Sequence, residues 1–310
     1  MPPTNPQLLD DILHGLLRRY GTRVPDVERV MEILRSASLI KSAEDIENDH
    51  IAFRTLGVPH LGIQSLEKIF LHVGYQRRDA YTFPHKKLDA FWYAPPAEHY
   101  PRIFISELRV EQLSPASQTT IASYVCQIDS DPVDQLDLNN ASQVDNFLHT
   151  SLWRRPSWND YEQLRQESEY AAWVIYNRYY LNHFTISVHN LPPPYNSVAT
   201  LNRLLQQHGI SLNDSGGIVK QSPDGLLLQS SSVAEMVQAE FDDGQGGIET
   251  HPIAGSYIEF AERRVLPAFQ HLPATDLRRA HRREGFEAGN ADKIFESTYT
   301  EQTHRIPKRK

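Results

Sequence analysis

The 310-residue chain has one cysteine, no long hydrophobic run and no excess of basic residues. Cys126, in an apolar context that predicts burial, cannot form an intramolecular disulfide, which favours a reducing compartment. No stretch approaches the roughly 20 apolar residues of a membrane-spanning helix, and the first residues lack the layout of a secretory signal. The net charge of −8 provides no basic surplus to neutralise phosphates. These absences predict a cytoplasmic protein that binds neither membranes nor nucleic acid.

What the chain does contain is an ordinary globular composition, with 40% hydrophobic and 23% charged residues, and three strand-like segments. In each segment polar and apolar residues alternate. Successive side chains of a strand point to opposite faces, so each segment has one largely apolar face and places one potential metal ligand on the other. The segments are residues 48–54 with His50, 182–188 with His183, and 257–262 with Glu259.

Two histidines and one carboxylate with open positions form the ligand set of non-haem Fe(II) oxygenases. A carboxylate between Ile258 and Phe260 on a buried strand is costly unless it is paired or bound to a metal. The pattern alone leaves alternatives open, because either histidine could be an ordinary core residue. Glu262 is a competing carboxylate. His251 is a spare ligand candidate, although we expect it in a solvent-exposed or lid-forming loop at 244–256.

The order of the predicted elements occurs twice along the chain. A strand, a helix and three strands come first, and the same order returns after a mostly helical stretch that includes one helix over 160–179. We therefore predict an α+β fold in which two βαβββ modules close into an open barrel. The predicted segments are N-terminal helices (1–45), a first module (46–109), a helical insertion (110–181), a second module (182–265), and a C-terminal helix and tail (266–310).

Within the modules, the expected helices cover 63–73 and 197–208. The expected strands are 50–56, 80–83, 88–93 and 102–108 in the first module, and 183–188, 217–220, 226–230 and 257–262 in the second.

These motifs resemble known families. The strand at 256–264, the Gly-Phe-x-x-Gly-Asn turn at 285–290 and the Phe-Glu-Ser stretch at 295–297 resemble the C-terminus of 4-hydroxyphenylpyruvate dioxygenases, of the vicinal oxygen chelate superfamily. A closer resemblance, over nearly all of residues 47–302, is to the 2-oxoadipate dioxygenase/decarboxylase family. The motifs that carry it are DHIAFRT (49–55), PRIFISEL (101–108), SEYAAW (168–173) and NHFT (182–185).

The resemblance implies a vicinal-oxygen-chelate-like barrel with an Fe(II) ion held by His50, His183 and Glu259. It also implies an activity of lysine degradation, in which 2-oxoadipate and O2 give 2-hydroxyglutarate and CO2 without external 2-oxoglutarate. By position, Arg54 corresponds to the arginine that grips the substrate. Arg54 shares a strand face with His50, about 13 Å along at ~3.3 Å per residue. The alternative for Arg54 is a structural salt bridge to an acid such as Glu107.

Further side chains are candidates for the pocket or for hydrogen bonds that hold the ligands, although plain structural roles are equally open. These candidates are Ser106, Glu107, Gln229 and Ser230. Two other functions also stay open at this point. One is another metal-dependent reaction on the same scaffold, such as a 4-hydroxyphenylpyruvate-type dioxygenase or a lyase. The other is a non-catalytic binding protein that keeps the fold. The sequence makes no prediction of an oligomeric state.

Overall fold

Ten strands and ten α-helices make up the described part of the computed structural model, which covers residues 5–304. The strands are β1 (Asn48–Gly57), β2 (Gln76–Phe83), β3 (Leu88–Ala94), β4 (Arg102–Arg109), β5 (His183–Ser187), β6 (Lys220–Gln221), β7 (Leu227–Ser231), β8 (Met236–Asp242), β9 (Ile248–Ala254) and β10 (Tyr257–Arg263). The helices are α1 (Pro6–Arg23), α2 (Pro25–Ser36), α3 (Ile63–His72), α4 (Pro115–Val125), α5 (Ala141–His149), α6 (Trp158–Glu167), α7 (Glu169–Asn177), α8 (Val198–Gln207), α9 (Ala288–Ile294) and α10 (Thr300–Thr303).

Eight strands form one sheet in the order β2-β3-β4-β1-β5-β10-β7-β6. The first four belong to the first predicted module and the last four to the second. Each half repeats the same pairing, because β1 runs parallel to β4 and β5 runs parallel to β10. The halves join through the antiparallel pair β1 and β5. This arrangement confirms the predicted α+β fold of two βαβββ modules, while the segment boundaries stay a prediction.

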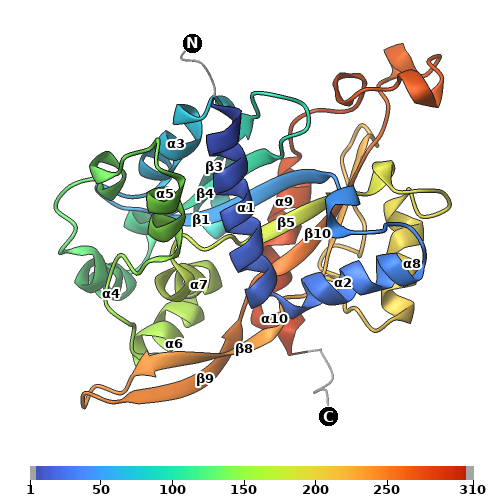
Figure 1. The fold of residues 1–310 in the computed structure, drawn as a ribbon. Coiled ribbons are helices and arrows are strands. Elements are labelled where there is room, and N and C mark those ends of the chain that lie inside the picture. The colour runs from blue at the N-terminus through green and yellow to red at the C-terminus, as the bar shows by residue number, and fades with distance from the viewer. Residues whose placement is uncertain (1–4, 305–310) are drawn as a thin grey trace.

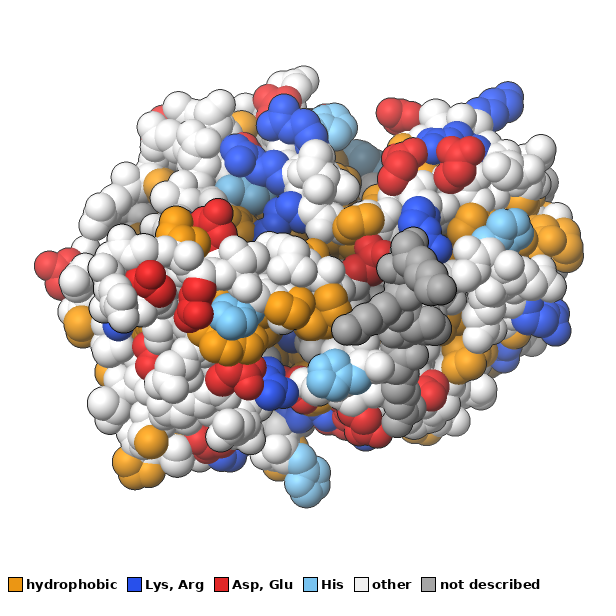
Figure 2. Space-filling model, turned by 90° about the horizontal axis from the view of Figure 1, so that it is seen from below, with side chains coloured by type: hydrophobic (Ala, Val, Ile, Leu, Met, Phe, Trp, Pro, Cys, Tyr) orange, Lys and Arg blue, Asp and Glu red, His pale blue; other side chains and the backbone are white. Residues whose placement is uncertain are grey.

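The two faces of the sheet are covered by different parts of the chain. Helix α1 crosses one face, where the Tyr20 ring lies 6.4 Å from the Phe184 ring between ring centroids (Figure 1). On the other face, α9 contacts the outer strands β2 and β6 and therefore reaches across the opening of the curled sheet. Seen from below, charged side chains of both signs are spread over the surface, and Lys and Arg gather in its upper half (Figure 2).

Three expectations about local structure are wrong. The helix predicted over 160–179 is divided, because Ser168 leaves helical geometry (φ −148°, ψ 103°) and its side chain caps α7 by accepting the Ala171 N–H. The loop predicted at 244–256 is mostly strand β9, which pairs with β8 in a separate hairpin. Cys126, predicted to be buried, is exposed at the end of α4. In addition, β2 starts four residues earlier than expected, and β6 has only two residues.

Candidate metal centre and substrate cavity

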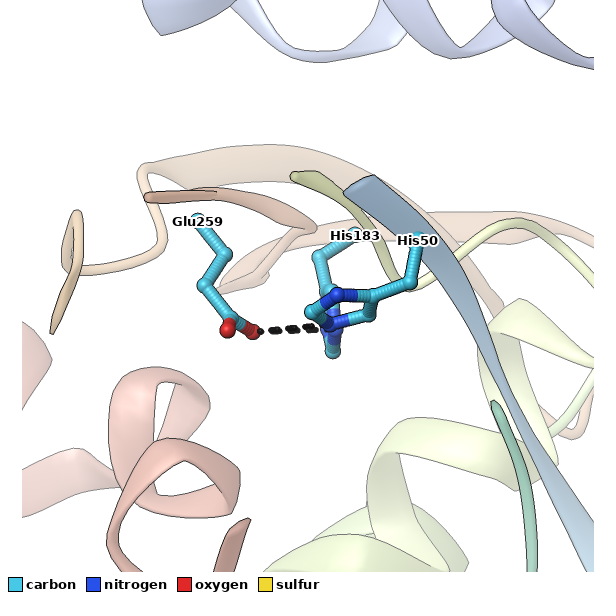
Figure 3. Close-up of side chains that lie close together, drawn as sticks. All are labelled: His50, His183 and Glu259. Carbon is cyan, nitrogen blue, oxygen red and sulfur yellow. Dashed lines mark ion pairs between the residues drawn. The ribbon is translucent and has the colours of Figure 1, made fainter. Parts of the chain in front are cut away.

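The three predicted ligand side chains meet on the inner face of the sheet. Glu259 Oε2 lies 3.1 Å from His183 Nε2 and 3.5 Å from His50 Nε2. One potential ligand atom from each of the three residues lies within 4.8 Å of the other two. The two imidazoles and the carboxylate point toward one another from three different strands (Figure 3). All three residues are buried.

Strand register explains why residues so far apart in sequence converge. Strands β1, β5 and β10 are adjacent in the sheet. Thr185 pairs with His50 on one side and with Glu259 on the other, and His183 lies two residues away on the same strand face. The apolar residues between them, such as Phe184 and Ile258, face the opposite side and enter the core. The alternation seen in the sequence therefore places all three ligands on one surface.

Hydrogen bonds fix the orientation of each candidate ligand. His50 Nδ1 bonds Asp49 at 2.8 Å, and His183 Nδ1 bonds Asn182 at 3.1 Å. Both rings therefore direct Nε2 toward Glu259. Gln229 donates to Glu259 Oε1 at 2.6 Å, which leaves Oε2 facing the imidazoles. Partners of this kind set the tautomer and the aim of metal ligands.

A register shift in β1 brings Asp49 to the same side as His50, although neighbours on a regular strand point apart. Asp49 accepts two hydrogen bonds from Arg263, at 2.7 and 2.9 Å, and Arg102 lies 3.4 Å away. Arg102 also pairs with Glu284. Burial alone would raise the pKa of the Asp49 carboxyl, but Arg263 and Arg102 hold it well below its usual value. Asp49 is therefore an anion that can orient His50.

Burial and neighbouring charges shift the pKa values of the two imidazoles in opposite directions. Burial, assisted by His50 and Arg54, lowers the pKa of His183 well below its usual value, so this ring is neutral and its Nε2 can bind a metal. Burial acts in the same direction on His50, but Glu259 and Asp49 outweigh it and raise its pKa. Two imidazole nitrogens and one carboxylate oxygen form a donor set suited to a divalent transition metal. The residues present thus fit a metal ion.

Beside these three side chains is a cavity between the sheet and the C-terminal segment. Its far side is formed by apolar residues of that segment, namely Phe286, Ala291, Ile294 and Phe295. The cavity is lined by His50, Ala52, Phe53, Arg54, Phe104, Ser106, Asn182, His183, Gln229, Tyr257, Glu259, Phe286, Ala291, Ile294 and Phe295.

Arg54 is 1% exposed and is the one arginine that lines this cavity. Its terminal nitrogens donate to the Phe295 carbonyl at 3.0 Å and the Thr298 hydroxyl at 2.9 Å. Its Nε has no hydrogen-bond partner among the described residues. The alternative pairing with Glu107 does not occur, because Glu107 lies on the opposite strand face and accepts the Ile63 N–H at 2.8 Å. A buried guanidinium without a carboxylate partner is thus available to an anionic ligand.

Of the other candidates from the sequence, one lines the cavity and three lie outside it. Ser106 lines the cavity, and its hydroxyl bonds that of Tyr170 at 2.9 Å. Ser230, predicted as a substrate contact, instead donates to Asn202 of α8 at 2.8 Å on the outer face. Glu262 accepts the Val198 N–H on that same face, at 2.9 Å. His251 on β9 stacks on Trp158, 4.1 Å between ring centroids. Ser230, Glu262 and His251 therefore do not enter the centre.

Sequence reasoning missed two kinds of site residue. Tyr257 lines the cavity with its ring 4.9 Å from His183, and no described residue completes a hydrogen bond to its hydroxyl. Its position two residues before Glu259 was a usable signal, since residues two apart share a strand face. Phe286 and Phe295 close the cavity from the C-terminal segment. No local sequence pattern predicts that these two residues close the cavity, because their position depends on how the C-terminal segment folds back onto the sheet.

Fold and site together define the class of this molecule. It has a glyoxalase-type, or vicinal-oxygen-chelate-like, fold with a buried His-His-Glu centre at the join of two modules. A putative glyoxalase superfamily protein from Ralstonia eutropha shares the fold, with a TM-score of 0.72 at 22% identity over 90% of this chain and 85% of that one. Among residues 5–304, no helix combines the length and hydrophobicity needed to span a bilayer.

A family model described as 2-oxoadipate dioxygenase/decarboxylase matches residues 12–275. A 2-oxoadipate dioxygenase/decarboxylase of Arabidopsis thaliana, named as chloroplastic, is 44% identical over 297 residues, 92% of this chain and 76% of that protein. The crystal structure of hydroxyglutarate synthase from Oryza sativa in complex with 2-oxoadipate matches with a TM-score of 0.87 and 40% identity, over 98% of this chain and 96% of that one. The chain belongs to the 2-oxoadipate dioxygenase/decarboxylase family, which confirms the predicted resemblance and the expectation of an enzyme.

Proposed function

We propose that the protein is an Fe(II)-dependent dioxygenase/decarboxylase that converts 2-oxoadipate and O2 to 2-hydroxyglutarate and CO2. The reaction balances without a further co-substrate. The CO2 is the C1 carboxylate of the substrate with its own two oxygens, and both atoms of O2 enter 2-hydroxyglutarate, one in the new carboxylate at the former C2 and one in the hydroxyl. The observation that carries the proposal is the convergence of His50, His183 and Glu259 beside a cavity that also contains Arg54. The family membership and the 2-oxoadipate bound in the rice relative support the choice of substrate.

His50, His183 and Glu259 are the proposed ligands of the iron. When bound, Fe(II) would supply a Lewis acid that a 2-oxo acid can chelate. It would also supply a redox centre that reacts with O2. The residues around it hold the ligands in place, since Asp49, Asn182 and Gln229 each bond one ligand side chain. Iron is the proposed metal because a facial set of two histidines and a carboxylate leaves positions for both substrate and oxygen.

Arg54 is the proposed partner of the distal carboxylate of the substrate. It lies four residues after His50 on the same strand face, so its side chain and the ligands face one cavity. A guanidinium recognises a carboxylate through two parallel hydrogen bonds, and burial strengthens that interaction. Ser106 and Tyr257 provide hydroxyl groups in the same cavity. This lining favours a substrate whose distal end is a carboxylate rather than a phenol.

The test is anaerobic reconstitution with Fe(II), followed by oxygen-electrode assays and mass analysis of the product. We expect oxygen uptake with 2-oxoadipate, formation of 2-hydroxyglutarate, and no uptake with 4-hydroxyphenylpyruvate. The variant His183→Ala should lose bound iron and turnover together. Uptake with 4-hydroxyphenylpyruvate alone would replace the proposed substrate, and equal iron in both proteins would overturn the ligand assignment.

The cytoplasm is the proposed compartment and lysine degradation the proposed context. The free, exposed Cys126 fits a reducing environment. The plant relatives are named as chloroplastic, or as chloroplastic and amyloplastic. A fluorescent fusion of the native gene product, imaged in its own cell, distinguishes cytoplasm from organelle.

A further inference from the structure

A second hollow, outside the substrate cavity, lies between the ends of α1 and α7 and strand β8. It has a volume of about 780 Å³. Four arginines line it, namely Arg23, Arg154, Arg155 and Arg178. None of its lining residues also lines the substrate cavity. We call this hollow the arginine groove.

Only one of the four arginines has an ion-pair partner among residues 5–304. Arg155 pairs with Glu240 at 3.0 Å. Arg23 instead donates to the neutral Asn177 at 3.0 Å and stacks over the Tyr180 ring at 3.6 Å. Arg154 donates to the Ser123 hydroxyl and stacks over Tyr124, and each of these contacts is uncharged. The groove therefore concentrates positive charge in a protein whose net charge is −8.

Arg178 is the most constrained of the four. Its backbone has φ 56° and ψ −129°, a conformation that a residue with a side chain rarely adopts. One terminal nitrogen reaches the Trp153 carbonyl at 3.5 Å, and Nε has no hydrogen-bond partner among the described residues. Strained backbone of this kind persists where the surroundings enforce it, and it concentrates at ligand sites.

The electrostatics agree with an anion site. Burial lowers the pKa of Arg23, and the neighbouring Arg178 lowers it further. Burial likewise lowers the pKa of Arg178, and Arg155 adds to this effect. Tyr180 and Tyr176 oppose these shifts. Glu240, the one carboxylate among the lining residues, pairs with Arg155, so no paired carboxylate of residues 5–304 offsets the repulsion between Arg23 and Arg178. An anion bound between them would remove that repulsion.

We propose that the arginine groove binds a small polyanion, a molecule with at least two phosphate or carboxylate groups. A molecule with two such groups can contact unpaired arginines of several elements at once, since Arg23 lies on α1, Arg178 after α7 and Arg154 in the loop before α6. Guanidinium groups bind phosphate and carboxylate oxygens through the same paired geometry. The groove adjoins the starts of two ligand-bearing strands, since Tyr180 precedes His183 and Ser256 precedes Tyr257.

The test is calorimetric titration of the metal-free full chain with inorganic pyrophosphate and, separately, with citrate at low salt. We expect saturable binding of at least one probe, weakened by added NaCl. The double variant Arg23→Gln/Arg178→Gln should bind that probe about tenfold or more weakly, because it loses two charge-assisted contacts. Arg18→Gln is the matched control, since Arg18 is exposed on α1 outside the groove and its loss should change affinity less than about twofold.

Preference for pyrophosphate identifies a phosphorylated ligand, and preference for citrate identifies a polycarboxylate. Absence of saturable binding to both probes overturns the proposal, as does an equal loss in the Arg18→Gln control. If the double variant fails to fold, Arg154→Gln replaces it, and binding should weaken by about threefold or more because one charge-assisted contact is lost. A selenate-soaked crystal gives an independent answer, because its anomalous peak should lie among the groove arginines. A peak beside Arg54 alone would assign the binding to the substrate cavity instead. Neither measurement depends on turnover, so the outcome is separate from the proposed reaction.

Discussion

At the scale of single residues, charge placement distinguishes the two buried arginine environments of this protein. Arg263 and Arg102 meet Asp49, so their charges are compensated and the result is a rigid support for His50. Arg54 meets carbonyl and hydroxyl oxygens and the rings of Tyr170, Trp173 and Phe295, so no carboxylate of residues 5–304 is paired with it. Buried charge of the first kind is structural, whereas buried charge of the second kind is costly unless a ligand completes it.

This difference predicts the substrate specificity of an Arg54 variant. In Arg54→Met, the ratio of kcat/KM for 2-oxoadipate to that for 2-oxohexanoate, which lacks the distal carboxylate, should fall by about 10- to 100-fold. Bound iron should stay near the wild-type level. The same substitution at Arg165, which pairs with Glu162 at the surface, is the control and should leave the ratio unchanged. An equal loss with both substrates would mean that Arg54 only supports the fold.

A second residue-scale prediction concerns acid stability. His189 Nδ1 accepts the Arg263 backbone N–H at 3.2 Å, which requires a neutral acceptor nitrogen. Burial lowers the pKa of His189 to about 3, although Asp49 opposes the shift. The unfolded chain titrates near about 6.5, so between these values it binds more protons than the folded protein. The free energy of unfolding should therefore fall as pH drops from 6.5 toward 3, by at most about 1.4 kcal/mol per pH unit from this group.

Urea denaturation between pH 4 and 7 measures that slope. His189→Gln keeps a side-chain acceptor but cannot titrate, so its unfolding free energy should depend less on pH than that of the wild type. His14→Gln makes the same substitution on the exposed side of α1 and should keep the wild-type slope. If the free energy of unfolding depends on pH in the same way for the wild type and His189→Gln, other groups control the stability at acid pH.

At the scale of elements, the sequence predicted what depends on local periodicity and missed what depends on distant partners. Strands β1, β4 and β5 fall within one or two residues of their predicted bounds, because apolar alternation on a two-sided sheet is a local signal. Strand β6 pairs with β7 over only two residues, Lys220 and Gln221. The β8–β9 hairpin was missed because the Gly-rich turn at 244–247 dominates the local composition, whereas pairing between its arms decides the structure.

The link between β1 and α3 provides an element-scale prediction. Gly62, directly before α3, has φ 80° and ψ −159°, a region accessible essentially to glycine alone. A Cβ at this position would lie 2.5 Å from Glu107 Oε2, the oxygen that accepts the Ile63 N–H. Gly62→Ala should therefore lower the free energy of unfolding by about 1–3 kcal/mol, as measured by urea denaturation.

Gly21 is the matched control for that substitution. It lies within α1, and a Cβ there would meet nothing within 4 Å. Gly21→Ala should raise the free energy of unfolding by about 0.5–1 kcal/mol, because alanine favours the helix and loses less entropy on folding. A Gly62→Ala protein as stable as the wild type would show that the turn before α3 relaxes easily.

At the scale of the whole molecule, the two modules contribute unequally to the centre. His50 and His183 hold equivalent positions, because each lies on the first strand of its module and pairs with the fourth, at Arg102 and Tyr257. Two residues further along, the second module has Glu259 and the first has Phe104. The sequence therefore predicted the convergence of the three ligands from alternation and repeat order. It could not predict the contents of the cavity, because Phe104 and the C-terminal segment meet there only in the folded chain.

Because the proposed ligands come from both modules, a bound metal should hold the two halves of the sheet together. The unfolded chain does not hold these three side chains near one another, so metal binds the folded state and raises the free energy of unfolding by about 2.7 kcal/mol at 100 times its Kd. Anaerobic calorimetry should show an increase in Tm of about 4 °C when Fe(II) is added at that excess to chelator-treated protein. His50→Ala should lose this increase, whereas His208→Ala, outside the centre at the end of α8, should keep it. A full increase in His50→Ala would mean that the metal is held within the second module alone, and the centre would then not join the two halves.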